Sequence, residues 1–299
     1  MTAERRLLLV HAHPDDETIA TGATMARYAA EDVQVTLVTC TLGELGEIRV
    51  PSLAGLASDR ADQLGGYRIA ELAAAMRELG VSDYRFLGGA GRWRDSGMID
   101  TPGNDDSRAF WACAADEALF DEAVSHLVAV IDEVQPQVLI TYDENGGYGH
   151  PDHIMAHRVA TAAVERARWS VPRVYWHMIP KSFLQQGIDA LVASGQGGFD
   201  GMTSADEFPF GAEDHEVTTV LPNIGFGAAK TAAMRAYATQ ISPESSFFAL
   251  IEALGEDAFA QEHFRLVRGE LSAERDAEGR EPGLFGAGLF EAGLFEAGQ

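Results

Sequence analysis

Histidines and carboxylates gather in two short motifs that lie far apart in the sequence. Residues 11–17 have the sequence His-Ala-His-Pro-Asp-Asp-Glu, and residues 148–153 have the sequence Tyr-Gly-His-Pro-Asp-His. Each motif follows an apolar run typical of a buried strand, at residues 7–10 and 138–140. Open α/β sheets bind their ligands at the carboxyl ends of the strands. Imidazoles and carboxylates at that edge could hold a divalent metal ion and use it for hydrolysis.

Three of these side chains form a complete set of metal ligands. A catalytic divalent metal takes three protein ligands and keeps a position open for water and substrate. His13, Asp16 and His153 provide two imidazoles and one carboxylate for one ion per chain. The set suits zinc best and also suits ferrous iron. His157 follows His153 by four residues on a predicted helix and is an alternative further ligand.

The remaining polar residues of the motifs could carry the proton transfers of amide hydrolysis. Asp15 would act as the general base on the attacking water, because only one of the two adjacent carboxylates needs to bind the metal. A protonated His150 would face the oxyanion and later protonate the leaving amine, with Asp152 as the partner that keeps its ring charged. Tyr148 would donate its phenol to the same oxyanion.

The predicted secondary structure alternates between strands and helices. Strands are expected at residues 7–11, 33–39, 84–87, 138–141, 174–178 and 216–221, and helices at residues 16–30, 60–79, 116–134, 227–241 and 248–254. This order predicts an α/β, Rossmann-like, mostly parallel sheet with helices on both faces. In the common doubly wound order the first and fourth strands are neighbours. The two motifs would then meet in one crevice.

The chain divides into three predicted segments. Residues 1–170 form the Rossmann-like catalytic core with the metal site, and residues 171–280 form a less regular α+β portion that caps and completes the cleft. Residues 281–299 contain three repeats of Leu-Phe-Gly/Glu-Ala-Gly. Disorder is the favoured interpretation of this tail, and docking of its Leu-Phe pairs on a neighbouring subunit of a homo-oligomer is the alternative. The Gly-rich loop at residues 88–108 is a candidate lid.

Composition excludes several classes of partner. The chain has 299 residues, with 22 Lys and Arg against 46 Asp and Glu, for a formal net charge of -24. Such a surface repels nucleic acid and anionic membranes. Two cysteines, Cys40 and Cys113, cannot form a disulfide framework or a multi-cysteine zinc site. We find no apolar segment suited to a signal peptide or membrane span, and expect a cytoplasmic protein.

The sequence resembles the LmbE/PIG-L family of metal-dependent N-deacetylases. His-Pro-Asp-Asp-Glu at residues 13–17 and His-Pro-Asp-His at residues 150–153 match the signature pair of that family. Within the family, the sequence is similar to the branch that removes acetate from N-acetylglucosaminyl-inositol in mycothiol biosynthesis. The stretches that carry this closer resemblance are residues 39–44, 63–68, 87–98 and 145–150.

The resemblance implies a role for each matching residue. It places the metal on His13, Asp16 and His153, the base at Asp15, and oxyanion contacts at His150 and Tyr148. It also implies three substrate contacts, Glu47, Arg68 and Asp95. These charged side chains would hold the hydroxyls of a small, neutral N-acetylated amino-sugar inositol.

Other functions stay open at this point. Mycothiol S-conjugate amidase shares the metal motifs, and Glu144 suits it equally, whereas the loop at residues 92–95 and Gly149 favour the deacetylase. A deacetylase of another N-acetyl sugar, and a metal-dependent sugar-binding protein without turnover, are further alternatives. A non-haem iron oxygenase would use similar ligands, but nothing in the sequence suggests a 2-oxoacid site. A nicotinamide enzyme is disfavoured because Arg94 stands where the last glycine of its loop belongs.

Overall fold

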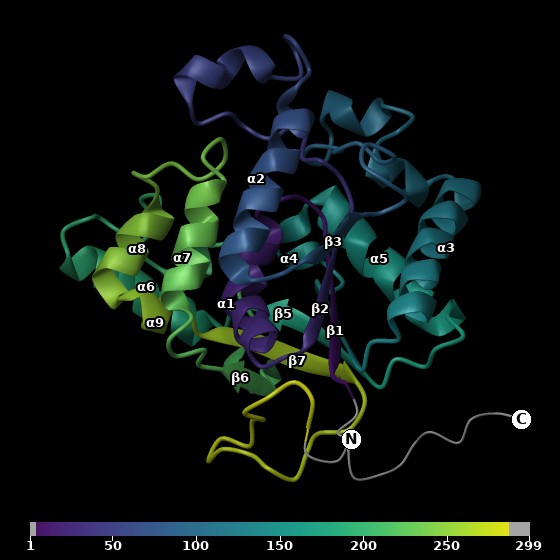
Figure 1. Cartoon of the computed structure of the whole chain (residues 1–299). Coiled ribbons are helices and arrows are strands. Elements are labelled where there is room, and N and C mark those ends of the chain that lie inside the picture. The colour runs from purple at the N-terminus through teal and green to yellow at the C-terminus, as the bar shows by residue number, and fades with distance from the viewer. Residues whose placement is uncertain (1–3, 287–299) are drawn as a thin grey trace, which may run out of the picture.

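The computed structural model describes residues 4–286 and shows one mixed sheet between two layers of helices (Figure 1). The strands follow the order β3-β2-β1-β4-β5-β7-β6. The first five in the sequence are parallel, and β7 runs antiparallel between β5 and β6. The strands are β1 (Arg6–His11), β2 (Gln34–Thr39), β3 (Asp83–Phe86), β4 (Val138–Thr141), β5 (Arg173–Met178), β6 (Thr219–Leu221) and β7 (Glu262–Arg268). The predicted fold class is confirmed.

Successive apolar side chains of β1 point to opposite faces of the sheet and join a hydrophobic core on each face. Leu7 and Leu9 pack with α1, α2 and α7, whereas Leu8 and Val10 pack with α3 and α5, as expected when successive side chains point to opposite faces. The helices are α1 (Asp16–Ala30), α2 (Leu64–Leu79), α3 (Glu117–Val134), α4 (Gly146–Gly149), α5 (Pro151–Arg166), α6 (Lys181–Ala193), α7 (Gly227–Ala236), α8 (Ser246–Leu254) and α9 (Glu256–Phe259). Short 3₁₀ segments occur at Pro51–Leu56, Pro102–Asp105, Phe110–Ala114, Ala205–Glu207 and Asp214–Glu216.

Strand β1 lies between β2 and β4, with Leu9 opposite Ile140. The two histidine motifs follow β1 and β4, so they lie at the same edge of the sheet, as predicted. This position is the switch point at which the strand order reverses. The sheet therefore brings together two segments that are far apart in the sequence.

Several predicted boundaries differ from the structure. Helix α2 begins at Leu64 rather than at residue 60, β6 begins at Thr219 rather than at residue 216, and our prediction missed α6 and β7. Helix α7 ends at Ala236 rather than at residue 241. There the tertiary hydrogen bonds of Tyr237 and Thr239 direct the chain away from the helix. Such tertiary contacts override the helix propensity of the local sequence, so the helix ends earlier than predicted.

The C-terminal portion extends the same sheet, because β5, β7 and β6 follow β4 in the strand order. The expected boundary at residue 170 therefore does not separate two sheets. Within residues 4–286, no helix combines the length and the apolar character that crossing a membrane requires.

The start of the predicted tail is part of the core. Glu281, Leu284 and Phe285 are buried, and the backbone N–H of Leu284 donates to the Tyr28 hydroxyl at 2.9 Å. The prediction of disorder is therefore wrong for residues 281–286. The other two repeats lie outside the described residues.

Candidate metal centre and active site

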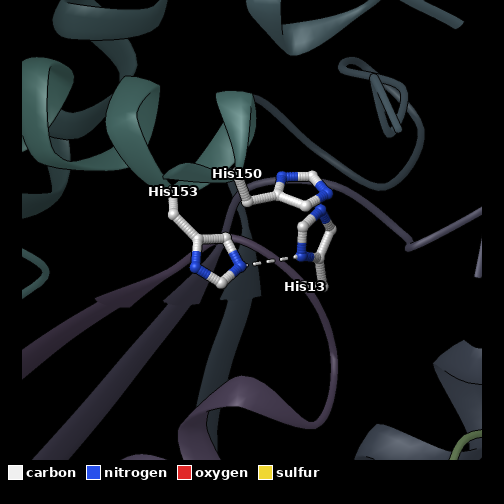
Figure 2. A group of neighbouring side chains, drawn as sticks. All are labelled: His13, His150 and His153. Carbon is white, nitrogen blue, oxygen red and sulfur yellow. Dashed lines mark hydrogen bonds between the residues drawn. The ribbon is translucent and has the colours of Figure 1, made fainter. Parts of the chain in front are cut away.

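Two turns place the predicted ligands. Strand β1 ends at His11 and α1 begins at Asp16, so the connection between them carries His13. His153 lies in the first turn of α5, which follows the glycine-rich segment after β4. Figure 2 shows His13, His150 and His153 converging from these two segments.

The proposed ligand atoms form an equilateral triangle. His13 Nδ1 lies 3.3 Å from His153 Nε2, and Asp16 Oδ2 lies 3.3 Å from each of these nitrogens. A tetrahedral ion with bonds of about 2.0–2.1 Å separates its ligand atoms by about 3.3–3.4 Å. The triangle therefore has the dimensions of one face of a divalent metal site.

The charges at this triangle are also suited to a cation. Burial opposes charge on Asp16, but the two neighbouring imidazoles outweigh this effect and hold its pKa well below the usual range. Burial likewise opposes charge on His13, yet Asp95, Asp152 and Asp16 together raise its pKa well above the usual value. The carboxylates thus favour positive charge at His13, which a metal ion would supply in place of a proton.

The far side of the His13 ring is held by a carboxylate. His13 Nε2 lies 3.1 Å from Asp152 Oδ2. Asp152 in turn accepts hydrogen bonds from the backbone N–H of Ser96 at 2.9 Å and from its hydroxyl. A carboxylate on the outer nitrogen fixes the tautomer and the direction of a metal-binding histidine. Our prediction that the Asp152 carboxylate pairs with His150 is wrong, because it faces His13.

His150 presents a neutral ring with a defined tautomer. Its Nδ1 accepts the backbone N–H of Asp152 at 3.2 Å, which leaves the ring proton on Nε2. Burial, reinforced by His13 and His153, lowers the pKa of His150 to about 3. The ring is therefore a hydrogen-bond donor without charge, and the prediction of a protonated His150 is corrected.

Asp15 adopts a strained backbone conformation beside the triangle. Its φ is 112° and its ψ is -36°, a region that residues other than glycine rarely adopt. Its carboxylate lies 3.0 Å from Arg68 Nη2. Burial raises the pKa of Asp15 to about 7, against the opposing charge of Arg68. A carboxyl with that pKa can both take and return a proton near neutral pH.

The predicted substrate contacts lie in different surroundings. The Arg68 guanidinium is buried and also donates to the carbonyls of Gly43 and Pro14. The Asp95 carboxylate is buried, accepts two backbone N–H groups and lies 3.6 Å from His13 Nε2. Glu47 is on the surface, 73 % exposed, and pairs with Arg49 at 3.0 Å.

Tyr148 lies at the mouth of the site. The residue is 40 % exposed, and its ring centroid is 5.0 Å from that of His153 and 6.1 Å from that of His150. Burial of its hydroxyl raises the pKa of Tyr148, so the phenol keeps its proton. Apart from Glu47, the structure brings the predicted residues to one edge of the sheet: His13, Asp15, Asp16, Arg68, Asp95, Tyr148, His150, Asp152 and His153.

Sequence reasoning missed one buried residue that holds a proposed ligand. The Tyr142 hydroxyl donates to Asp16 Oδ2 at 2.8 Å and accepts the backbone N–H of Ala12 at 2.9 Å. Its position directly after β4, beside the end of β1, was the available signal. His157 binds the Tyr142 carbonyl at 3.0 Å through Nδ1 and packs against Trp176, so we do not assign it to the metal.

Two other groups of buried side chains overlap the triangle, and one of them adds His150 to His13 and His153. His13, Asp95 and Asp152 also have possible ligand atoms within 4.8 Å of one another. Asp95 and Asp152 approach Nε2 of the His13 ring, whereas Asp16 and a second imidazole, His153, approach its Nδ1, each at 3.3 Å. We therefore favour the Asp16–His13–His153 triangle as the metal centre.

A family model and the curated relatives that match this chain agree on one family. The family model described as "PIG-L: GlcNAc-PI de-N-acetylase" matches residues 8–164. A relative from Geodermatophilus obscurus, 56 % identical over 95 % of this chain and 98 % of its own, is named 1D-myo-inositol 2-acetamido-2-deoxy-alpha-D-glucopyranoside deacetylase. A relative of the same name from Acidothermus cellulolyticus is 56 % identical over 94 % of each chain.

Solved structures show a similar fold. A deacetylase from the biosynthesis pathway of teicoplanin, crystallised as a bog complex, aligns with a TM-score of 0.54 at 21 % identity. The alignment covers 89 % of this chain and all of that one. The sheet, the two motifs and the close relatives agree, and the chain belongs to the PIG-L family of de-N-acetylases.

Proposed function

We propose that this protein hydrolyses the N-acetyl amide of N-acetylglucosaminyl-inositol with one divalent metal ion, zinc before ferrous iron. The observation that carries the proposal is the 3.3 Å triangle of His13, Asp16 and His153 ligand atoms beside the Asp15 carboxylate. Relatives that are 56 % identical over nearly the whole chain bear the name of this deacetylase. The products are acetate and a free amine.

The side chains around the triangle have different roles in hydrolysis. When bound, the metal would lower the pKa of water and polarise the acetyl carbonyl. Asp15 takes the proton of the attacking water as the new C–O bond forms, and it returns that proton to the nitrogen as the C–N bond breaks. The Nε2–H of His150 and the hydroxyl of Tyr148 donate to the oxyanion.

We assign substrate recognition to three charged side chains, of which Asp95 and Arg68 lie at this centre and Glu47 lies on the surface. Asp95 is held rigidly by two backbone N–H groups, so it offers a fixed acceptor for a sugar hydroxyl. Arg68 would bind a second hydroxyl beside Asp15, and the exposed Glu47 would reach the inositol at the rim. We propose that residues 171–280 complete the cleft, and the contacts of the segment after α7 with Glu17 and Glu71 support this.

The first experiment compares two amides. Metal-stripped enzyme is reloaded with zinc or ferrous iron, and amine release is measured from N-acetylglucosaminyl-inositol and from a mycothiol S-conjugate. We expect metal-dependent release that is faster from the acetylated sugar. Faster cleavage of the conjugate would assign the protein as the amidase, and sugar binding without release from either would indicate a binding protein.

A further inference from the structure

The backbone of Asp15 needs support from its surroundings. Its φ of 112° is costly for a residue with a side chain, and the turn persists only if other contacts hold it. Its carbonyl accepts the N–H groups of Thr18 and Ile19, both at 3.0 Å. Its own N–H donates to Glu17 Oε2 at 3.0 Å. The Glu17 side chain is therefore the acceptor that holds the amide of Asp15 in this turn.

Glu17 is a buried carboxylate with neutral partners. The residue has no exposed surface. Its Oε1 accepts hydrogen bonds from the Thr18 hydroxyl at 2.6 Å and from the Tyr237 hydroxyl at 2.5 Å, while Oε2 accepts the backbone N–H of Asp15. A buried carboxylate depends on such donors to stay in one orientation. Thr18 is its neighbour in the chain, so Tyr237 is the one long-range donor among these three partners.

Tyr237 is itself firmly placed. It is buried and follows directly after α7. Two residues later, Thr239 donates to the Glu71 carboxylate of α2 through its N–H at 2.9 Å and its hydroxyl at 2.8 Å. The carbonyl of Thr239 accepts the N–H of Arg49 at 2.8 Å. The segment after α7 is thus anchored to α2, and it offers the Tyr237 hydroxyl from a rigid position.

We propose that Tyr237 is a positioning residue for deacetylation, which acts through Glu17 on the backbone of Asp15. The inference rests on the proposed role of Asp15 as the base. Without the hydroxyl, the Glu17 carboxylate keeps only Thr18 on Oε1 and can rotate away from the Asp15 N–H. The Asp15 backbone then relaxes from its strained conformation, and its carboxylate leaves the position from which it reaches the attacking water. Small displacements of a reacting group cost up to about 10²-fold in rate.

The test is the Y237F variant, which keeps the ring and removes the hydroxyl. We expect kcat to fall about tenfold, with KM changed less than about twofold and the bound metal unchanged. Tyr28→Phe is the matched control. Tyr28 is a buried tyrosine of α1 whose hydroxyl accepts the N–H of Leu284 at 2.9 Å, far from Asp15 in its contacts. The control should keep the wild-type kcat.

Two further measurements separate positioning from general stability. In Y237F, but not in Y28F, the ¹⁵N–¹H resonance of Asp15 should shift. In a double-mutant cycle, Y237F combined with E17Q should be no slower than E17Q alone, because both changes break one chain of contacts. If Y237F does not fold, T18A removes the other donor to the same Glu17 oxygen and should shift the same resonance.

Some results would overturn the inference. A kcat for Y237F equal to that of Y28F, an unmoved Asp15 resonance, or losses that multiply with those of E17Q would each contradict it. Failure of the wild-type enzyme to release acetate would contradict the proposed function instead. The Asp15 resonance would still report whether Tyr237 holds that backbone.

Discussion

The two edges of the sheet bury charge in different ways. At the amino end of β5, Arg173 Nη2 lies 2.5 Å from Glu281 Oε2. The hydroxyls of Tyr175 and Thr219 donate to the same carboxylate oxygen at 3.2 Å. The charges of Arg173 and Glu281 are thus paired with each other, and the Glu281 carboxylate receives further donors from the chain itself. Figure 1 shows the segment that follows β7 below the sheet.

At the carboxyl edge, three possible metal ligands face one another. Asp16, His13 and His153 direct ligand atoms at one another across 3.3 Å, although lone pairs at that distance repel unless a proton or a metal lies between them. Asp15 is strained there as well. The first cluster therefore pairs its charges within the fold, whereas the second presents the donor set of a divalent metal site.

The largest loss of activity should come from removing one of the three proposed metal ligands. His153→Ala should abolish both metal retention and acetate release, because two ligands do not hold the ion in a catalytic site. Metal content by elemental analysis, together with the rate of acetate release, checks this prediction. His157→Ala, four residues along the same helix, is the control and should retain the metal. One equivalent of metal in H153A would remove His153 from the ligand set.

Next in size is the loss of the base. Asp15→Asn should keep one metal ion per chain and lower kcat by about 10²–10⁴-fold, because the amide cannot accept the proton of the attacking water. Steady-state kinetics on metal-loaded protein, with the metal content measured in the same sample, tests this. Wild-type turnover in D15N would refute the assignment of Asp15.

A smaller effect is expected from the far side of the His13 ring. Asp152→Asn weakens the acceptor at Nε2, so the affinity for the metal should fall about 10–100-fold, while kcat at saturating metal changes less. Competition with a chelator of known affinity measures this change. Unaltered metal affinity would show that Ser96, rather than His13, is the important partner of Asp152.

The ligand triangle could be predicted from the sequence because the positions of its three residues depend on local features. His13 and Asp16 follow one apolar strand and His153 follows another, and parallel strands bring such positions to one edge. The partner of Asp152 depends instead on how a loop far away in the sequence folds, since Ser96 is 56 residues earlier. No local pattern encodes that contact.

The same reason explains the missed tyrosines and the tail. Tyr142 and Tyr237 look like ordinary core residues in the sequence, and only tertiary structure brings their hydroxyls to Asp16 and Glu17. The pair at residues 284–285 has the composition of a low-complexity repeat. It packs because Tyr28 and Tyr175 come together from two distant elements to bind it.

The smallest effect on catalysis is expected at the Arg173–Glu281 pair. Glu281→Gln leaves Arg173 buried without its counter-ion, so the free energy of unfolding should fall by about 3–5 kcal/mol. The kcat of the folded fraction should stay at the wild-type value. Denaturant unfolding and kinetics on the same preparation check both statements. A lower kcat with unchanged stability would show that the two edges are not independent.

A zinc titration tests whether one metal ion per chain supports acetate release. Zinc is added in steps to metal-stripped enzyme, and acetate release from N-acetylglucosaminyl-inositol is measured at each step. We predict no release without metal, a rise in the rate that stops at one equivalent of zinc per chain, and no rise in H153A. Release by the stripped enzyme, or a rise of wild-type size in H153A, would contradict a metal centre built on His13, Asp16 and His153.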